Sequence, residues 1–306
     1  MTQLRAFLGL FQSGSFAAAS HGLGLSQTAV HRGVRELEDT LGRKLVERRG
    51  RGVYFNFAGR RFARSCRLAV GELQAALLEL GLDPSNLTIA VGTTPLARAF
   101  LVPEAMARMV AQSHSAGFRI SEGSWGELVE ALRDGHIDMI VGELPTDAIP
   151  DLAIAPLYDE APVIVAGNQH PLVGKTAPSL KTLASFPWII APESSPLRAQ
   201  WEHLFSLTRP QAPIECESIM IIGRLLTSSD MLTLAMPDQV ALQIRSGLLA
   251  RVGGPMADSM TTIGVTMRNG WKPTQVLGRF IDTLRGIGTE LNAQSGRNSI
   301  IEPRWV

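Results

Sequence analysis

The chain has 306 residues, which is too long for one ordinary domain and suits two or three domains that each bury a core. Its two cysteines, Cys66 and Cys216, lie far apart and form no CxxC pair, which argues for a reducing compartment and against a disulfide framework or a metal site. No apolar run reaches membrane-spanning length, and the run over residues 6–11 is too short for a secretory signal, so we expect a cytoplasmic protein.

Charge is unevenly distributed, although the formal net charge is only +1. Residues 1–82 contain twelve Lys and Arg against six Asp and Glu, whereas the rest of the chain contains seventeen against twenty-two. A basic head on an acidic body is typical of a chain that binds nucleic acid through one end.

Three short helices are predicted before residue 42. The first has a one-sided apolar stripe formed by Leu4, Phe7, Leu8 and Phe11. Ser15 can cap the second helix, over residues 16–23, and Gly24 supplies the tight turn that follows. Ser26 can cap the third helix, which has apolar residues at offsets of four, seven and eleven: Val30, Val34, Leu37 and Leu41.

The opposite face of the third helix is polar. Long donors, a hydroxyl and an imidazole gather there: Gln27, Thr28, His31, Arg32 and Arg35. Such side chains suit the base edges and phosphates of a DNA major groove, although any surface helix has a polar face. The two helices upstream and the segment downstream favour DNA binding, because residues 45–55 read as a hairpin wing around a turn rich in glycine and arginine.

A family resemblance rests on the residues from Ala18 to Val53. They follow the order AA-x3-L-x2-SQ-x-AV-x-R-x-V-RELE-x2-LG-x2-L-x-ER-x-GRGV, which resembles the N-terminal domain of LysR-type transcriptional regulators. This chain has Thr28 where the family usually has proline, His31 where it has serine, and FNFAG at residues 55–59 where it commonly has LT-x-AG. The resemblance implies a winged helix-turn-helix over residues 1–58. Its DNA contacts would come from Ser26, Gln27, Thr28, His31, Arg32 and Arg35, and from Arg49 and Arg51 of the wing.

A long helix is predicted from residue 57 to about 80, with Asn56 as its cap. Its apolar residues alternate at spacings of four and three over almost three heptads: Phe62, Cys66, Ala69, Leu73, Ala76 and Leu80. The seam packs either on its own domain or on a second copy. The resemblance favours the second copy, with residues 59–82 as a dimerisation linker and with tetramers common in the family. We interpret Cys66 as a small packing residue rather than a redox switch.

Beyond a hinge at residues 81–86, strands and helices alternate, which predicts parallel sheets covered by helices. Strands are expected at 87–91, 118–121, 137–141, 162–166, 188–191, 214–217, 231–235 and 262–267. Helices are expected at 95–110, 125–134, 196–207, 219–228, from 238, and at 274–291. The pattern resembles the family's two-lobed effector domain of the periplasmic-binding-protein type (type 2), here residues 83–292. We place lobe I at about 86–161 and 266–291, lobe II at about 162–265, and a polar tail at 293–306. The fold class is α/β overall with an all-α N-terminal domain.

Hydroxyl residues precede four of these helices: Thr94, Ser124, Ser195 and Ser218. Each alone indicates only a helix cap, and Ser124 with Glu127 forms a capping-box pattern. The resemblance places all four turns around one cleft between the lobes, with Thr93 and Ser194 adding donors. Helix N-termini would favour a carboxylate or another oxygen-rich ligand there. Trp125 suits a sugar or aromatic ring as well as it suits core packing.

We therefore expect a homo-oligomeric transcription regulator that binds double-stranded DNA and responds to a small-molecule effector, such as an organic acid, an aromatic acid or a sugar-like compound. The six histidines are scattered, and no nucleophile elbow, P-loop or GxGxxG is present, so we expect neither catalysis nor a cofactor. Two alternatives remain: a two-lobed solute-binding receptor with a helical extension, and a nucleoid-type DNA binder without an effector.

Overall fold

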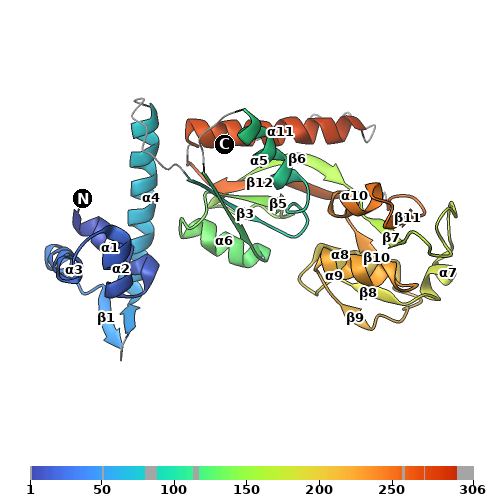
Figure 1. Ribbon diagram of the computed structural model, residues 1–306, viewed down its shortest axis with the longest axis horizontal. Helices are drawn as coiled ribbons and strands as arrows, with labels where there is room; N and C mark the ends of the chain where they lie inside the picture. The colour runs from blue at the N-terminus through green and yellow to red at the C-terminus, as the bar shows by residue number, and fades with distance from the viewer. Residues whose placement is uncertain are drawn as a thin grey trace. The chain divides into compact units, whose positions relative to one another are not determined.

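The computed structural model describes residues 2–49, 52–79, 88–112, 117–256, 259–271 and 273–294 (Figure 1). The chain divides near residue 85 into an N-terminal and a C-terminal unit. The described elements of the N-terminal unit are α1 (Thr2–Ser13), α2 (Phe16–Leu23), α3 (Gln27–Leu41), β1 (Val46–Arg49), β2 (Gly52–Phe55) and α4 (Phe57–Glu79). The expected three helices, hairpin and long helix are therefore confirmed.

Helices α2 and α3 begin and end where the sequence predicts. Ser15 accepts a hydrogen bond from the Ala18 N–H at 3.2 Å, and Ser26 accepts one from the Ala29 N–H at 3.1 Å. Gly24 ends α2 with φ of 64°, a left-handed conformation that glycine adopts without strain. These short connections hold α3 against α1 and α2, and the three helices share one apolar core.

The apolar stripe of α3 is shorter than predicted. Val30, Val34 and Leu37 are buried, whereas Leu41 is 41% exposed. Leu41 is the last residue of the helix, and the chain turns away at Gly42 before it can be covered. In α1 the buried face differs from the predicted stripe, because Ala6, Phe7 and Leu10 are buried whereas Leu4, Leu8 and Phe11 are half-buried.

Glu38 joins α3 to the wing. Its carboxylate is 7% exposed and accepts hydrogen bonds from Lys44 Nζ and from the Leu45 and Val46 N–H groups at 2.8, 2.8 and 3.0 Å. Strand β1 then pairs antiparallel with β2. The Glu38 carboxylate thus links α3 to the start of the wing.

Helix α4 begins as predicted, with Asn56 Oδ1 accepting from the Gly59 N–H at 2.9 Å. Cys66 is buried, and burial raises the pKa of its thiol, which fits the packing interpretation. Farther along the seam Ala69 is exposed and Leu73 is 50% exposed. The final seam residue, Leu80, lies outside the described residues.

The C-terminal unit contains two five-stranded sheets. Lobe I has the strand order β4-β3-β5-β12-β6, formed by Gly117–Glu122, Thr88–Thr93, Met139–Glu143, Thr261–Arg268 and Leu152–Glu160. Its helices are α5 (Leu101–Ala111), α6 (Trp125–Arg133) and α11 (Gln275–Gln294). Alternate residues of β3 and β5 point to opposite faces, so α5 and α11 cover one face and α6 covers the other (Figure 1).

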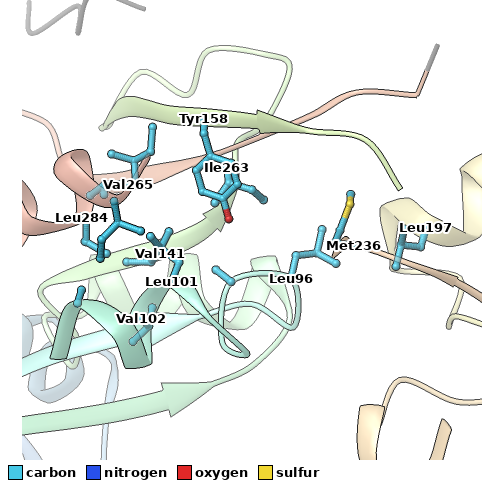
Figure 2. Close-up of a cluster of buried hydrophobic side chains, with 14 of the residues drawn as sticks. Leu96, Leu101, Val102, Val141, Tyr158, Leu197, Met236, Ile263, Val265 and Leu284 are labelled. Atoms are coloured by element: carbon cyan, nitrogen blue, oxygen red, sulfur yellow. The ribbon is translucent and has the colours of Figure 1, made fainter. Parts of the chain in front are cut away.

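Lobe II has the order β11-β7-β10-β8-β9, formed by Leu249–Val252, Val163–Gly167, Leu232–Ala235, Trp188–Ile190 and Ile214–Glu215. Its helices are α7 (Leu180–Ala184), α8 (Pro196–Leu204), α9 (Ile219–Thr227) and α10 (Pro237–Arg245). One buried cluster runs through both lobes, and Figure 2 shows Leu96 of lobe I beside Met236 of lobe II.

Both sheets are mixed rather than parallel. Strand β12 returns from lobe II and pairs antiparallel with β5 and with β6. The return therefore occurs by Thr261, and the expected boundary at residue 266 was wrong. Strand β6 was missed because it contains Pro156, which weakens a strand pattern. Proline is tolerated there because β6 lies at the sheet edge, where the register shifts beside Gly264.

Two further boundaries differ from expectation, and two short elements were not predicted. The helix expected from Pro95 begins at Leu101, and residues 95–100 form turns in which the Ala97 and Arg98 N–H groups both donate to Thr94 O. Elements α7 and β11 are short and were missed. Helix α11 continues to Gln294, and the rest of the predicted tail lies outside the described residues.

We expect Glu38→Gln to loosen the wing. Burial alone would raise the pKa of Glu38, but hydrogen bonds from Lys44, Leu45 and Val46 outweigh it and hold that pKa below its usual value. The contribution of the carboxylate is therefore present at pH 7 and is lost as the pH falls below about 4.5. Urea unfolding of the N-terminal unit at pH 7 should show a loss of about 2 kcal/mol, and hydrogen exchange over residues 45–55 should accelerate. Glu36→Gln, on the exposed face, is the control. Equal exchange in both variants would contradict the assignment.

Candidate functional site

One candidate surface is the outward face of α3. Gln27, Thr28, Arg32 and Arg35 are exposed along it. His31 is half-buried because its ring stacks on Phe16, with centroids 3.5 Å apart and planes 15° apart. The Ser26 hydroxyl is occupied by its capping bond.

This face opens into a hollow of about 520 Å³ between α3 and the wing. Phe16, Thr28, His31, Arg32, Arg35, Glu38, Lys44, Val46 and Glu47 line it. Arg32 makes only a loose 3.7 Å ion pair with Glu36. Arg49 is the last residue of β1, and Arg51 lies outside the described residues. Cationic, hydroxyl and aromatic groups thus share one concave surface.

A second candidate is a cleft of about 330 Å³ between the two lobes of the C-terminal unit. Ser124, Trp125, Ser194 and Ser195 line it, as expected from the sequence. Thr93, Thr94 and Ser218 do not line it, and both threonines are fully buried. The Thr94 hydroxyl instead donates to Glu143, which does line the cleft.

Of the four hydroxyl caps expected around the cleft, only Ser124 caps with its side chain. It faces Glu127, whose carboxylate accepts from the Ser124 hydroxyl and N–H at 2.7 and 2.9 Å, and these bonds lower the pKa of Glu127. Ser195 and Ser218 precede α8 and α9 without a side-chain capping bond. Thr94 precedes a turn rather than a helix. The helix N-terminus at α6 is therefore already occupied by the protein's own carboxylate.

The charge of the cleft was not anticipated from the sequence. Four glutamates line it with a single arginine: Glu122, Glu127, Glu143 and Glu217 with Arg98. Arg98 pairs with Glu122 at 2.9 Å, so three carboxylates remain without a basic partner among the lining residues. The sequence did contain a signal for two of these glutamates. Glu122 and Glu143 end strands β4 and β5, and the carboxyl ends of parallel strands meet at one edge of a sheet.

Trp125 lies where either of the two predicted roles would need it. It packs against the buried cluster under α6 and also lines the cleft. Trp125 therefore both packs on the core of lobe I and borders the cleft.

Comparison with known proteins gives matches to two family models. Residues 1–60 match the bacterial regulatory helix-turn-helix protein of the LysR family, and residues 83–287 match the LysR substrate binding domain. The chain belongs to the LysR family. The match accounts for both units, and it confirms the expected fold class and the expected function of a DNA-binding transcription regulator with an effector-binding domain.

Individual relatives agree with this LysR assignment. The regulator GalR of Pseudomonas putida is 30% identical over 94% of this chain and 74% of its own length. A full-length OxyR variant of Pseudomonas aeruginosa has a TM-score of 0.73 at 20% identity, covering 93% of this chain and 94% of that one. Full-length CbnR, solved with its target DNA, has a TM-score of 0.54 at 21% identity, covering 94% and 98%.

Metal-binding and membrane-spanning features are both absent from the described residues of this LysR-type regulator. They contain no group of three or more His, Cys, Asp or Glu that could hold a metal ion. Among the described helices, none combines the length and the apolar character needed to cross a membrane.

Polar contacts join the two lobes of the regulator. Gln239 of α10 accepts from the Met236 N–H and donates to Pro95 O of lobe I, at 3.0 and 3.1 Å. Asp238 accepts from the Tyr158 hydroxyl at 2.9 Å and donates its N–H to Glu160 at 3.1 Å. Desolvation and the nearby Asp238 carboxylate raise the pKa of Glu160 to about 8.

We expect Glu160→Gln to remove a pH dependence of stability. The pKa of Glu160 rises from 4.5 to about 8 on folding, so the unfolded chain loses this proton first and the folded protein loses stability as pH rises between those values. Urea unfolding monitored by tryptophan fluorescence should show that the free energy of unfolding falls less between pH 5 and pH 8.5 in the variant than in wild type. The exposed Glu193→Gln is the control, and equal pH slopes in wild type and Glu160→Gln would refute the role.

Proposed function

We propose that this LysR-type regulator reads operator DNA with the outward face of α3, through Gln27, Thr28, His31, Arg32 and Arg35. The observation that carries the proposal is the exposure of four of these five side chains on one helix face beside a wing that Glu38 holds in place. Ser26 then contributes by starting the helix. Arg49 and Arg51 of the wing contact phosphates or the minor groove.

The regulator acts as a homo-oligomer. Two recognition helices related by a two-fold axis reach two half-sites of a palindromic operator, which one copy cannot do. The exposed Leu73 of the seam and the nearby exposed Leu77 on α4 support pairing with a second copy through residues 59–82, because large apolar side chains gain free energy when a partner helix covers them. Tetramers are the further state expected from the family resemblance.

The effector occupies the cleft between the lobes, in contact with Ser124, Trp125, Ser194 and Ser195. Three carboxylates without a basic partner in the cleft disfavour an organic acid and favour a hydroxyl-rich, sugar-like compound, whose O–H groups donate to carboxylates. Trp125 supplies a flat apolar face for the ring. Thr94 acts from behind the cleft by orienting Glu143.

Effector binding changes the angle between the lobes, and the preferred angle sets operator binding or transcription. We infer a cytoplasmic location, because that is where a regulator meets chromosomal DNA. From its family we also infer a regulatory rather than a catalytic role. The basic N-terminal unit disfavours a solute-binding receptor, and a cleft that contains an oriented indole disfavours a nucleoid-type binder without effector.

Gel-shift titration of the purified protein against its own upstream DNA and a scrambled duplex tests the DNA-binding proposal. Specific binding should weaken steeply with salt. Arg35→Ala should cost about 1 to 3 kcal/mol, or about 5- to 150-fold in affinity. Arg279→Ala on the exposed side of α11 removes the same charge and is the control. Equal binding to both duplexes would favour the nucleoid-type alternative, and no binding at low salt would favour the receptor.

Thermal unfolding with matched ligands tests the chemistry of the cleft. Galactose and phenol should raise the midpoint more than galacturonate and benzoate, because the acids meet three carboxylates. Trp125→Ala should abolish the shift, whereas Trp271→Ala, which removes an indole that lines no part of the cleft, should retain it. Preference for the acids in the wild-type protein would overturn the assignment.

A further inference from the structure

The aromatic ring of Phe16 in α2 stacks on the imidazole of His31 in α3. Phe16 is the first residue of α2, and its position is set by Ser15, which caps that helix. His31 lies in the second turn of α3, and the tight turn at Gly24 brings the two helices together. A centroid distance of 3.5 Å with planes 15° apart means that one face of the imidazole is covered by the phenyl ring.

This contact restrains the imidazole on the recognition surface. Both rings line the same hollow as Thr28, Arg32 and Arg35. Stacking uses the face of the imidazole, whereas its nitrogens lie in the ring plane and can form hydrogen bonds. A side chain restrained before binding loses less conformational entropy when it contacts DNA.

The neighbours of His31 argue that it contacts a base. Arg32 and Arg35 flank it and bind phosphate more strongly than an imidazole does, because they carry a permanent charge and several donors. The early turns of a recognition helix approach base edges in the major groove. Guanine and adenine present N7 there, and guanine also presents O6, all of which accept a hydrogen bond from an imidazole N–H.

We propose that His31 reads a purine edge in each half-site and that Phe16 is the residue that positions it. This inference rests on the proposed role of the α3 face in operator binding. The inference makes Phe16 a specificity determinant that acts by holding His31 in place. Unlike the arginines, Phe16 contributes no charge and no hydrogen bond to DNA.

Selection from a randomised duplex pool tests the inference, with the full-length protein and its variants. Wild type should enrich a purine at one position of each half-site, and His31→Ser should lose that preference while other positions are retained. Phe16→Leu should reduce discrimination at the same position at least about fivefold, with affinity for the scrambled duplex changed less than about twofold, since the mutation leaves the phosphate-binding charges in place. Phe16→Tyr, which keeps a stacking ring, should restore the preference.

Two controls separate positioning from folding. His21→Ser removes an exposed histidine of α2 outside the stack and should select the wild-type sequence. The double variant Phe16→Leu, His31→Ser should discriminate no worse than His31→Ser alone, because the two residues act as one unit. If His31→Ser selects the wild-type sequence with unchanged discrimination, the inference is wrong. If wild type enriches no sequence, the proposed operator recognition fails, and the inference fails with it.

Discussion

A buried backbone polar group must find a hydrogen-bond partner, and both candidate binding surfaces of this protein are built where side chains meet that requirement. Glu38 satisfies the first N–H groups of the wing and so fixes the wing to the recognition helix. Gln239 satisfies the start of α10 and at the same time holds Pro95 of the opposite lobe. The same bonds that complete local structure therefore also fix the geometry of the two candidate surfaces.

The two surfaces differ in electrostatic character. The hollow beside α3 gathers Arg32, Arg35 and Lys44, which suits a polyanion. The cleft between the lobes gathers carboxylates around Arg98, which suits ligands that donate hydrogen bonds. Glu160 and Asp238 add acidic groups at the junction of the lobes, where desolvation raises the pKa of each. The basic N-terminal unit thus carries the surface with the arginines, and the acidic C-terminal unit carries the cleft with the carboxylates.

Local features were predictable because they depend on residues close in sequence. Caps at Ser15, Ser26 and Asn56, the turn at Gly24 and the wing were all found where expected. Strand β6 was not predicted, because Pro156 interrupts its strand pattern. A proline is compatible with this strand only because β6 lies at the sheet edge, and that position depends on the pairing with β12. The hydroxyl residues before the helices, with the residues next to them, predicted four of the residues that line the cleft. The glutamates of the cleft were not predicted, because the segments that bring them together are far apart in sequence.

The sequence by itself determined the family, the recognition helix and its polar face, since a helical period and a short motif are local properties. Only the tertiary structure decided that the sheets are mixed, that Thr94 supports Glu143 instead of capping a helix, and that His31 stacks on Phe16. The physical reason is that each of these depends on a contact between separate elements. Their distance and orientation follow from packing of the whole core and have no period in the sequence.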